Sequence, residues 1–319
     1  LFRSDSLTEL LYVCCGLVCF YSVYKTLKDK EHPSKWPTAL FWGIFGFIFA
    51  FSRIGLIWGN DQIKINDTVI GYLIVVMAIL SAFKLVKINK FSESTDEFKN
   101  TMSQKIGNMI FVPALALAII AFLVAQFWTE QLGSLVALGI ATVIALILAL
   151  IITKGKFSDS AEDGRRLLEL IGPLCILPQL LAALGSVFST AGVGEVIANG
   201  ISAVIPQGNI LLGVIAYCVG MALFTMIMGN AFAAFAVITI GIGIPFVISQ
   251  GANPVIASAL ALTAGYCGTL MTPMAANFNI VPTAILDIED KKYGLIKYQV
   301  PVAITMLIIH IILMYVWAF

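Results

Sequence analysis

Two polar, glycine-rich breaks interrupt long apolar sequence in the C-terminal half of the chain, and they constrain its fold more than any other feature. The first break is Met228-Gly229-Asn230, and the second runs from Gly265 to Asn279. In lipid an unpaired backbone N–H or C=O group costs several kcal/mol, so a helix can stop at membrane depth only inside protein or beside a polar cavity. Broken helices of transporters meet this condition. The breaks therefore predict a solute site, and their apolar flanks are 210–227, 231–248, 254–264 and 280–286.

Apolar segments of membrane-spanning length recur along the whole chain. Its 319 residues are 60% hydrophobic and 12% charged, and a helix needs about 20 apolar residues to cross a bilayer. We therefore expect an all-α, polytopic membrane protein with about ten membrane segments in contact with lipid. The expected segments are 10–24, 36–51, 69–83, 106–128, 134–153, 167–188, 193–205, the pair within 210–248, the broken segment 254–286, and 300–319.

The basic residues indicate how these segments cross the membrane. Sixteen of the 19 Lys and Arg side chains fall in four loops, which the positive-inside rule places in the cytoplasm, so that both termini lie outside. Between Arg166 and Lys291 the chain starts and finishes inside, which requires an even number of crossings. The 210–248 pair is then either a re-entrant hairpin with Gly229-Asn230 at its tip or two full spans. An uncharged Gly-Asn turn favours a buried tip.

The same topology predicts two inverted repeats, residues 1–154 and residues 155–319. Each repeat has one span, a pair that starts and ends on the same side, and two further spans or broken segments. The middle of the first pair carries Arg53, Asp61 and Lys64, which suit a solvated loop. We therefore expect the first repeat to be degenerate and the second to carry the re-entrant hairpin, the discontinuous helix and the solute site.

The predicted site has to bind its ligands with neutral groups, because Glu195 is the only charged residue between Gly172 and Leu286. Asparagine and threonine oxygens, with carbonyl groups freed at the breaks, suit sodium, while helix N-termini suit a substrate carboxylate. The alternative is helix packing, with glycine at close contacts and Asn or Thr bonding between helices. The candidate binding residues are Gly229, Asn230, Gly265, Gly268, Thr269, Thr272, Pro273, Asn277 and Asn279, with sodium at Asn230, Thr272 and Asn277.

Other polar groups favour structural roles. His310 lies within the last apolar segment and is interpreted as a packing histidine, with a proton relay as the alternative. Arg165, Arg166 and Glu169 are interpreted as anchors at the membrane boundary. Enzymatic motifs are absent and only two histidines occur, so we predict no enzyme, no catalytic residue and no cofactor apart from a sodium ion. The basic loops lack aromatic interleaving, which argues against nucleic-acid binding.

Three stretches carry a family resemblance. They are Gly229 to Phe235 (GNAFAAF), Gly265 to Asn279 (GYCGTLMTPMAANFN) and Leu177 to Gly185 (LPQLLAALG). These stretches resemble a bacterial membrane family of the ion-transporter superfamily, whose members are described as 5-oxoproline (pyroglutamate) transporter subunits encoded beside a second homologous membrane subunit. The resemblance covers most of the chain and is most specific in its second half.

The resemblance implies a transport domain that moves against a scaffold, often in a dimer. In dicarboxylate and citrate carriers of the superfamily, Ser-Asn-Thr motifs at hairpin tips bind sodium and substrate. Here Gly229-Asn230 matches that motif only at its asparagine, whereas Gly265 to Asn279 resembles the second broken helix. We therefore expect a secondary transporter, or transporter subunit, for a small organic anion such as 5-oxoproline in the bacterial inner membrane. Its expected coupling ion is sodium, or alternatively protons, and its expected partner is a homologous subunit or a second copy. The alternative is a non-transporting scaffold or regulatory subunit of a two-component transporter.

Overall fold

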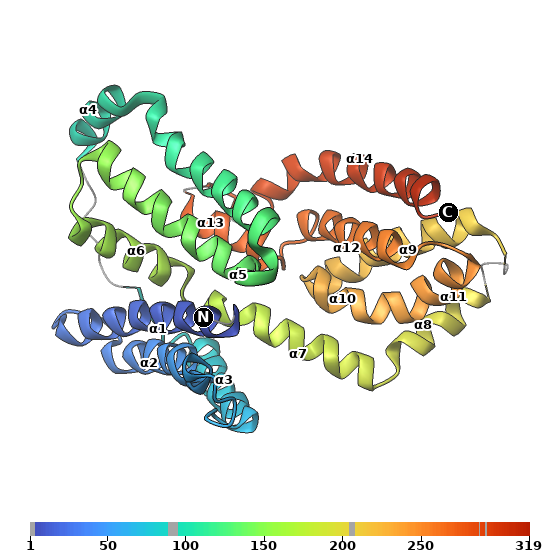
Figure 1. Ribbon diagram of the computed structural model, residues 1–319, viewed down its shortest axis with the longest axis horizontal. Helices are drawn as coiled ribbons and strands as arrows, with labels where there is room; N and C mark the ends of the chain where they lie inside the picture. The colour runs from blue at the N-terminus through green and yellow to red at the C-terminus, as the bar shows by residue number, and fades with distance from the viewer. Residues whose placement is uncertain (1–3, 89–94, 204–207, 287, 291) are drawn as a thin grey trace. The chain divides into compact units, whose positions relative to one another are not determined.

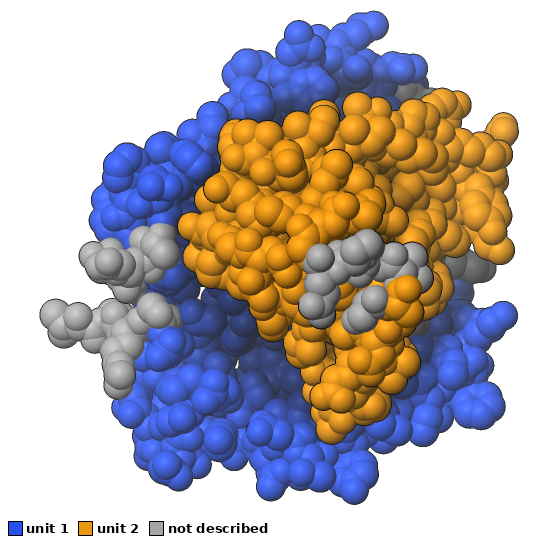
Figure 2. Space-filling view, turned by 90° about the vertical axis from the view of Figure 1, so that its right-hand side faces the viewer, with its two compact units in different colours: residues 1–173 blue, residues 174–319 orange. Residues whose placement is uncertain are grey.

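The computed structural model describes residues 4–88, 95–203, 208–286, 288–290 and 292–319, and every regular element in those ranges is a helix (Figure 1). The chain forms two compact units, Leu1–Pro173 and Leu174–Phe319 (Figure 2). Among the described residues, 7 helices are long and apolar enough to cross a membrane, or up to 8 if the pair Phe157–Ile171 and Leu174–Thr190 forms one broken span. The chain is thus an all-α, multi-pass membrane protein. The count of ten segments and the inverted repeat stay predictions.

Unit 1 is built around two tightly packed helices near the N-terminus. Gly16 of α1 faces Gly46 of α2, and a β-carbon on Gly16 would lie 2.8 Å from the Gly46 carbonyl oxygen. Such small residues let membrane helices approach closely. The elements of this unit are α1 (Ser4–Lys28), α2 (Lys35–Phe51), the 3-10 helix η1 (Ile54–Trp58), α3 (Asp67–Ala82), α4 (Asp96–Ile106), η2 (Gly107–Phe111), α5 (Val112–Thr153) and α6 (Phe157–Ile171).

Helix α5 consists of two arms. Its backbone is not helical at Trp128 and at Gly133, where φ is 73°. The first arm lies within the segment expected at 106–128 but begins only at Val112, after η2, and the second arm matches the segment expected at 134–153. A glycine suits this junction because the left-handed region is unfavourable for residues with a β-carbon.

Helix α6 carries charges that the sequence analysis interpreted as membrane anchors, and for two of them this interpretation is wrong. Arg165 is 4% exposed and Glu169 is 2% exposed. Their side chains form an ion pair of 2.7 Å within the helix. Glu162 links this pair to α1, because it contacts Arg165 and also forms an ion pair of 3.0 Å with Lys25 of α1. Of the three predicted anchors, Arg166 alone lies near the surface, where it pairs with Asp163.

The segment expected as one span at 167–188 is broken. Helix α6 ends at Ile171 because Gly172 adopts a φ of 49°. A 3-10 turn, η3 (Gly172–Ile176), follows, and α7 (Leu177–Thr190) then begins with a proline in its first turn. Proline has no N–H group, so it fits the start of a helix better than its interior.

Unit 2 places two broken segments around α9. Its remaining elements are α8 (Val193–Ser202), α9 (Ile210–Met228), α10 (Ala231–Ile238), the π-helix η4 (Thr239–Gly243), α11 (Ile244–Phe246), η5 (Ile248–Gln250), α12 (Pro254–Leu270), the π-helix η6 (Ala276–Ile280), α13 (Val281–Ile285) and α14 (Gly294–Trp317). Helix α9 packs against α10, α12 and α14. The end of the segment expected at 193–205 lies outside the described residues.

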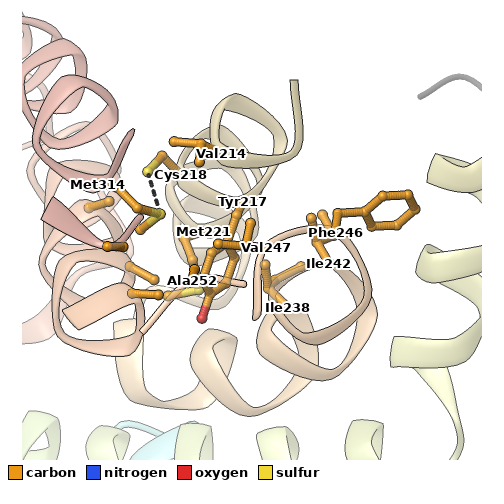
Figure 3. Close-up of a cluster of buried hydrophobic side chains, with 14 of the residues drawn as sticks. Val214, Tyr217, Cys218, Met221, Ile238, Ile242, Phe246, Val247, Ala252 and Met314 are labelled. Atoms are coloured by element: carbon orange, nitrogen blue, oxygen red, sulfur yellow. Dashed lines mark hydrogen bonds between the residues drawn. The ribbon is translucent and has the colours of Figure 1, made fainter. Parts of the chain in front are cut away.

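The core of unit 2 gathers on one face of α9 (Figure 3). Tyr217 is fully buried, and its hydroxyl lies 2.8 Å from the Thr239 hydroxyl at the start of η4. Gly243 makes room for the same ring, since a β-carbon there would lie 2.6 Å from it. The neighbouring residue on α9, Cys218, contacts α14 instead, and its thiol donates to the Met314 sulfur at 3.9 Å. This core fixes α9 relative to α10 and α14, and so determines where the C-terminal end of α9 lies.

Candidate functional site

The first break reverses the chain in two residues. Helix α9 ends at Met228 because Gly229 adopts a φ of 69°, and the Gly229 N–H donates to the Thr225 carbonyl at 2.7 Å. Asn230 then starts α10, since its Oδ1 accepts from the N–H groups of Phe232 at 2.8 Å and Ala233 at 3.3 Å. This is the usual combination of a glycine C-cap followed by an asparagine N-cap. The two caps end one helix and start the next within two residues, and α9 and α10 pack against each other.

The tip of this pair is packed inside unit 2. Gly229 is buried, and a β-carbon there would lie 2.7 Å from the Met274 carbonyl oxygen in the second break. The tip therefore contacts protein, as the uncharged Gly-Asn turn indicated. Both arms, Ile210–Met228 and Ala231–Gln250, are long enough to span a membrane, so their lengths fit a re-entrant hairpin and two full spans equally.

The second break separates α12 from η6, and its carbonyl groups are bonded by nearby side chains. The chain is non-helical from Met271 to Ala275. Asn279 is 3% exposed, and its amide nitrogen donates to the carbonyls of Thr269 at 2.9 Å and Thr272 at 2.7 Å. The Thr272 hydroxyl donates to the Met226 carbonyl of α9 at 2.9 Å. The last of these bonds joins the second break to the last turn of α9, directly before the first break.

A small cavity of about 30 Å³ lies where the two breaks meet. A cavity of this size holds about one water molecule. All of the residues around it are uncharged, and the N-terminus of α10, which carries partial positive charge, forms one side. The lining residues are Leu181, Gly229, Asn230, Ala231, Phe232, Tyr266, Thr269, Ala275, Ala276 and Phe278.

Three aromatic rings from three different segments line this cavity. Phe232 and Tyr266 have ring centroids 6.2 Å apart, and Tyr266 and Phe278 have centroids 5.9 Å apart. Sequence reasoning missed these rings, because aromatic side chains are common throughout apolar segments. Their position directly beside the breaks was the only available signal. Leu181 was also missed as a lining residue, although it lies in the stretch that carries the family resemblance.

The predicted site residues fall into distinct groups. Gly229, Asn230 and Thr269 line the cavity, whereas Thr272 and Asn279 form the hydrogen bonds between and within the breaks. Pro273 lies in the non-helical stretch 271–275. The backbone of Asn277 belongs to η6, but its side chain lies outside what the structure describes.

Two predicted glycines serve close packing between helices. A β-carbon on Gly268 would lie 2.1 Å from the Ala222 carbonyl oxygen of α9. A β-carbon on Gly265 would lie 2.9 Å from the Met221 methyl group. Neither glycine lines the cavity, so at these two positions the geometry matches the packing alternative.

The chemistry available to a cation comes from neutral oxygens. Asn230 Oδ1 already caps α10. Among the buried polar atoms that the structure describes, Asn279 Oδ1 and Thr225 Oγ1 have no hydrogen-bonding partner. A sodium ion accepts such neutral oxygens as ligands. No group of three or more His, Cys, Asp and Glu residues in the described part of the chain is arranged to hold a metal ion.

Comparison with known proteins assigns a family to nearly the whole chain. A family model described as "Protein of unknown function (DUF979)" matches residues 9–319. No curated protein and no solved structure matches the chain.

Proposed function

The chain belongs to the DUF979 family, and we propose that it is a secondary active transporter, or a subunit of one, for a small organic anion. The observation that carries this proposal is the meeting of two helix breaks around an uncharged polar cavity. Breaking two helices inside apolar sequence is costly in a membrane, and transporters use such breaks to bind solutes near the bilayer midplane. The resemblance to the ion-transporter superfamily supports the same function.

We propose 5-oxoproline as the leading substrate. It has one carboxylate and one ring amide, which suit a helix N-terminus and neutral hydrogen-bonding groups. The N-terminus of α10 and the side chains of Asn230 and Thr269 supply these groups. The rings of Phe232, Tyr266 and Phe278 supply apolar surface for the substrate ring.

Binding such a solute requires the two breaks to move apart. The cavity of about 30 Å³ is far smaller than the cavities of about 300–1,000 Å³ that usually hold small molecules. The elements that have to move are the tip at Gly229-Asn230 and the stretch 271–275. A transporter needs this kind of motion, because its site must open to one side of the membrane at a time.

Sodium is the leading coupling ion, because the unpartnered buried oxygens of Asn279 and Thr225 are neutral. Protons are the alternative. For His310, a packing role is supported by the 2.7 Å contact between its Nδ1 and the Met306 carbonyl in the same helix. The proposed location is the bacterial inner membrane with both termini outside, and the proposed partner is a homologous subunit or a second copy.

The rival proposal is a non-transporting scaffold or regulatory subunit. The tight packing of Gly265 and Gly268 against α9 favours it, because a scaffold keeps broken helices for packing alone. Under this proposal the residues that line the cavity are dispensable for transport by the complex.

Uptake of radiolabelled 5-oxoproline into proteoliposomes tests the proposal. We expect accumulation that depends on an inward sodium gradient, either with the chain alone or with its homologous partner. Uptake by the chain alone removes the need for a partner, and uptake only with the partner makes the chain a subunit. Absence of uptake in both preparations overturns 5-oxoproline as the substrate.

A further inference from the structure

A second cavity, of about 430 Å³, lies in unit 1 between the first turns of α1 and the segment that joins α2 to α3. It shares no residue with the site in unit 2. Asp5, Glu9 and Tyr12 are spaced four and three residues apart on α1, so they lie on one face of that helix. The cavity is lined by Asp5, Ser6, Thr8, Glu9, Tyr12, Arg53, Leu56, Gly59 and Asp61.

The outer wall of this cavity is a loop that is solvent-exposed, as its charged sequence indicated, and that is also ordered by its own hydrogen bonds. Backbone hydrogen bonds close the loop on itself, from Ile65 N–H to the Ser52 carbonyl at 2.9 Å and from Gly55 N–H to the Ile63 carbonyl at 3.1 Å. The Ser6 hydroxyl attaches the loop to α1 by donating to the Leu56 carbonyl at 2.7 Å. The wall is therefore held in place before any ligand binds.

The charges of the described residues around the cavity do not balance. Among these residues Arg53 is the only basic one that lines it, and its guanidinium pairs with Asp61 at 2.9 Å. Glu9 is only 3% exposed, and one of its carboxylate oxygens accepts the backbone N–H of Arg53 at 3.3 Å. The other oxygen, Oε2, has no hydrogen bond or ion pair with the described residues. Asp5 adds a further negative charge at the exposed rim.

Three carboxylates and one guanidinium of the described residues line the cavity, and Glu9 shares the attraction of that guanidinium with Asp61. A further cation beside the buried Glu9 therefore stabilises the protein. A metal ion fits poorly, because no described group of three or more acidic, His or Cys side chains is arranged to hold one. The volume instead falls in the range of about 300–1,000 Å³ that is typical of sites for small organic molecules. An ammonium group also gains from an aromatic ring such as Tyr12.

We propose that this cavity binds a small organic cation through a primary ammonium group, with Glu9 accepting its N–H donors. Charged N–H donors pair strongly with a carboxylate. Asp5 adds attraction at the rim, and Tyr12 offers its ring to the cation. The Arg53 guanidinium pairs with Asp61 and also attracts Glu9, so a bound ammonium group shares Glu9 with Arg53.

Thermal unfolding of the full chain in detergent tests this proposal with ethanolamine hydrochloride at neutral pH and constant ionic strength. Ethylene glycol is the matched uncharged probe, because it replaces the ammonium group with a hydroxyl group of similar size. We expect a saturable rise in Tm with ethanolamine and none with ethylene glycol. Equal responses to the two probes overturn the proposal.

Variants locate the response. Glu9→Gln removes the charge at nearly constant shape and is expected to raise the half-saturating concentration of ethanolamine about tenfold or more. Glu31→Gln is the matched control, because Glu31 is exposed in the loop after α1. If Glu9→Gln does not fold, Asp5→Asn at the rim is expected to weaken binding several-fold. If Glu9→Gln folds and its half-saturating concentration is unchanged, the proposal is overturned. If Glu9→Gln does not fold, an unchanged half-saturating concentration in Asp5→Asn overturns it.

The ammonium group has two natural sources, a soluble amine and the headgroup of phosphatidylethanolamine. Nanodiscs of phosphatidylcholine and of phosphatidylethanolamine separate them. If the wild-type chain responds to ethanolamine in phosphatidylcholine but not in phosphatidylethanolamine, the lipid headgroup already occupies the site. The Glu9→Gln variant is then expected to behave in the same way in both lipids. A response that is the same in both lipids assigns it to a soluble amine.

Discussion

Gly229 lies against Met274 so closely that a β-carbon at position 229 would be 2.7 Å from the Met274 carbonyl oxygen. The tip between α9 and α10 and the non-helical stretch after α12 are therefore in direct backbone contact. This contact brings the two polar breaks of the sequence to a single place. Because the two backbones are so close, even the smallest added side chain at position 229 disturbs this contact.

Gly229→Ala is expected to destabilise unit 2 and to reduce uptake. The added methyl group must displace the second break, and the φ of 69° is strained for alanine. Gly192→Ala is the matched control, because Gly192 has a φ of 73° and open space around its β-carbon position. We expect Gly229→Ala to lose about 1–3 kcal/mol more in stability than Gly192→Ala. Equal losses in thermal unfolding contradict this prediction.

Asn230→Ala is expected to abolish uptake, whereas Asn253→Ala retains it. The two asparagines make the same kind of N-cap, since Asn253 Oδ1 accepts from Val255 N–H at 3.0 Å and Ile256 N–H at 3.3 Å. Each variant is expected to lose about 1 kcal/mol of stability. Only Asn230 lines the cavity. Equal uptake by the two variants in proteoliposomes favours the scaffold proposal.

Glu169→Ala is expected to destabilise unit 1 by up to about 3–5 kcal/mol, because the buried Arg165 loses its 2.7 Å partner and retains Glu162. The double variant Arg165→Met with Glu169→Leu is expected to recover most of this loss. Asp163→Asn is the control, because its pair with Arg166 is exposed and worth about 1 kcal/mol or less. Thermal unfolding in detergent measures all three, and a loss in Glu169→Ala no larger than in Asp163→Asn contradicts the buried pairing.

The start of α14 is expected to loosen in acid. Hydrogen bonds from the backbone N–H of Tyr293 and from Lys297 lower the pKa of Asp290, which is outside the membrane spans. A lowered pKa in the folded state means that the stabilisation is present above the unfolded pKa and is lost as pH falls through the folded value. Hydrogen exchange of the peptide around 292–297, corrected for intrinsic rates, measures this change. Asp290→Asn is expected to remove the pH dependence, and its persistence in that variant contradicts the assignment.

The sequence was sufficient to predict helix breaks whose causes are local. Gly229 followed by Asn230 supplies a C-cap and an N-cap by residue type alone, and both caps occur in the structure. The stretch around Pro273 likewise ends α12, but the predicted start of this break at Gly265 is wrong, because α12 continues through Gly265 and Gly268 to Leu270. These positions were predictable because backbone conformation and capping depend on neighbouring residues.

The features that the sequence did not predict depend on distant contacts. The hydrogen bond between Thr272 and Met226 spans 46 residues, so no local pattern indicates it. The burial of Arg165 and Glu169 depends on how α6 packs in unit 1, and an amphipathic helix of this composition also suits the membrane surface. The break at Gly172 was not predicted, since glycine also occurs inside membrane helices.

The Thr272–Met226 hydrogen bond has a mechanical consequence. Because it joins α9 to the stretch after α12, a displacement of either broken segment pulls on the other. Under the proposed function the two breaks move apart when a solute binds, so this hydrogen bond has to break before the cavity opens. It stabilises the closed arrangement, and the interactions of a bound solute have to compensate for its loss, about 0.5–1.5 kcal/mol for a typical hydrogen bond.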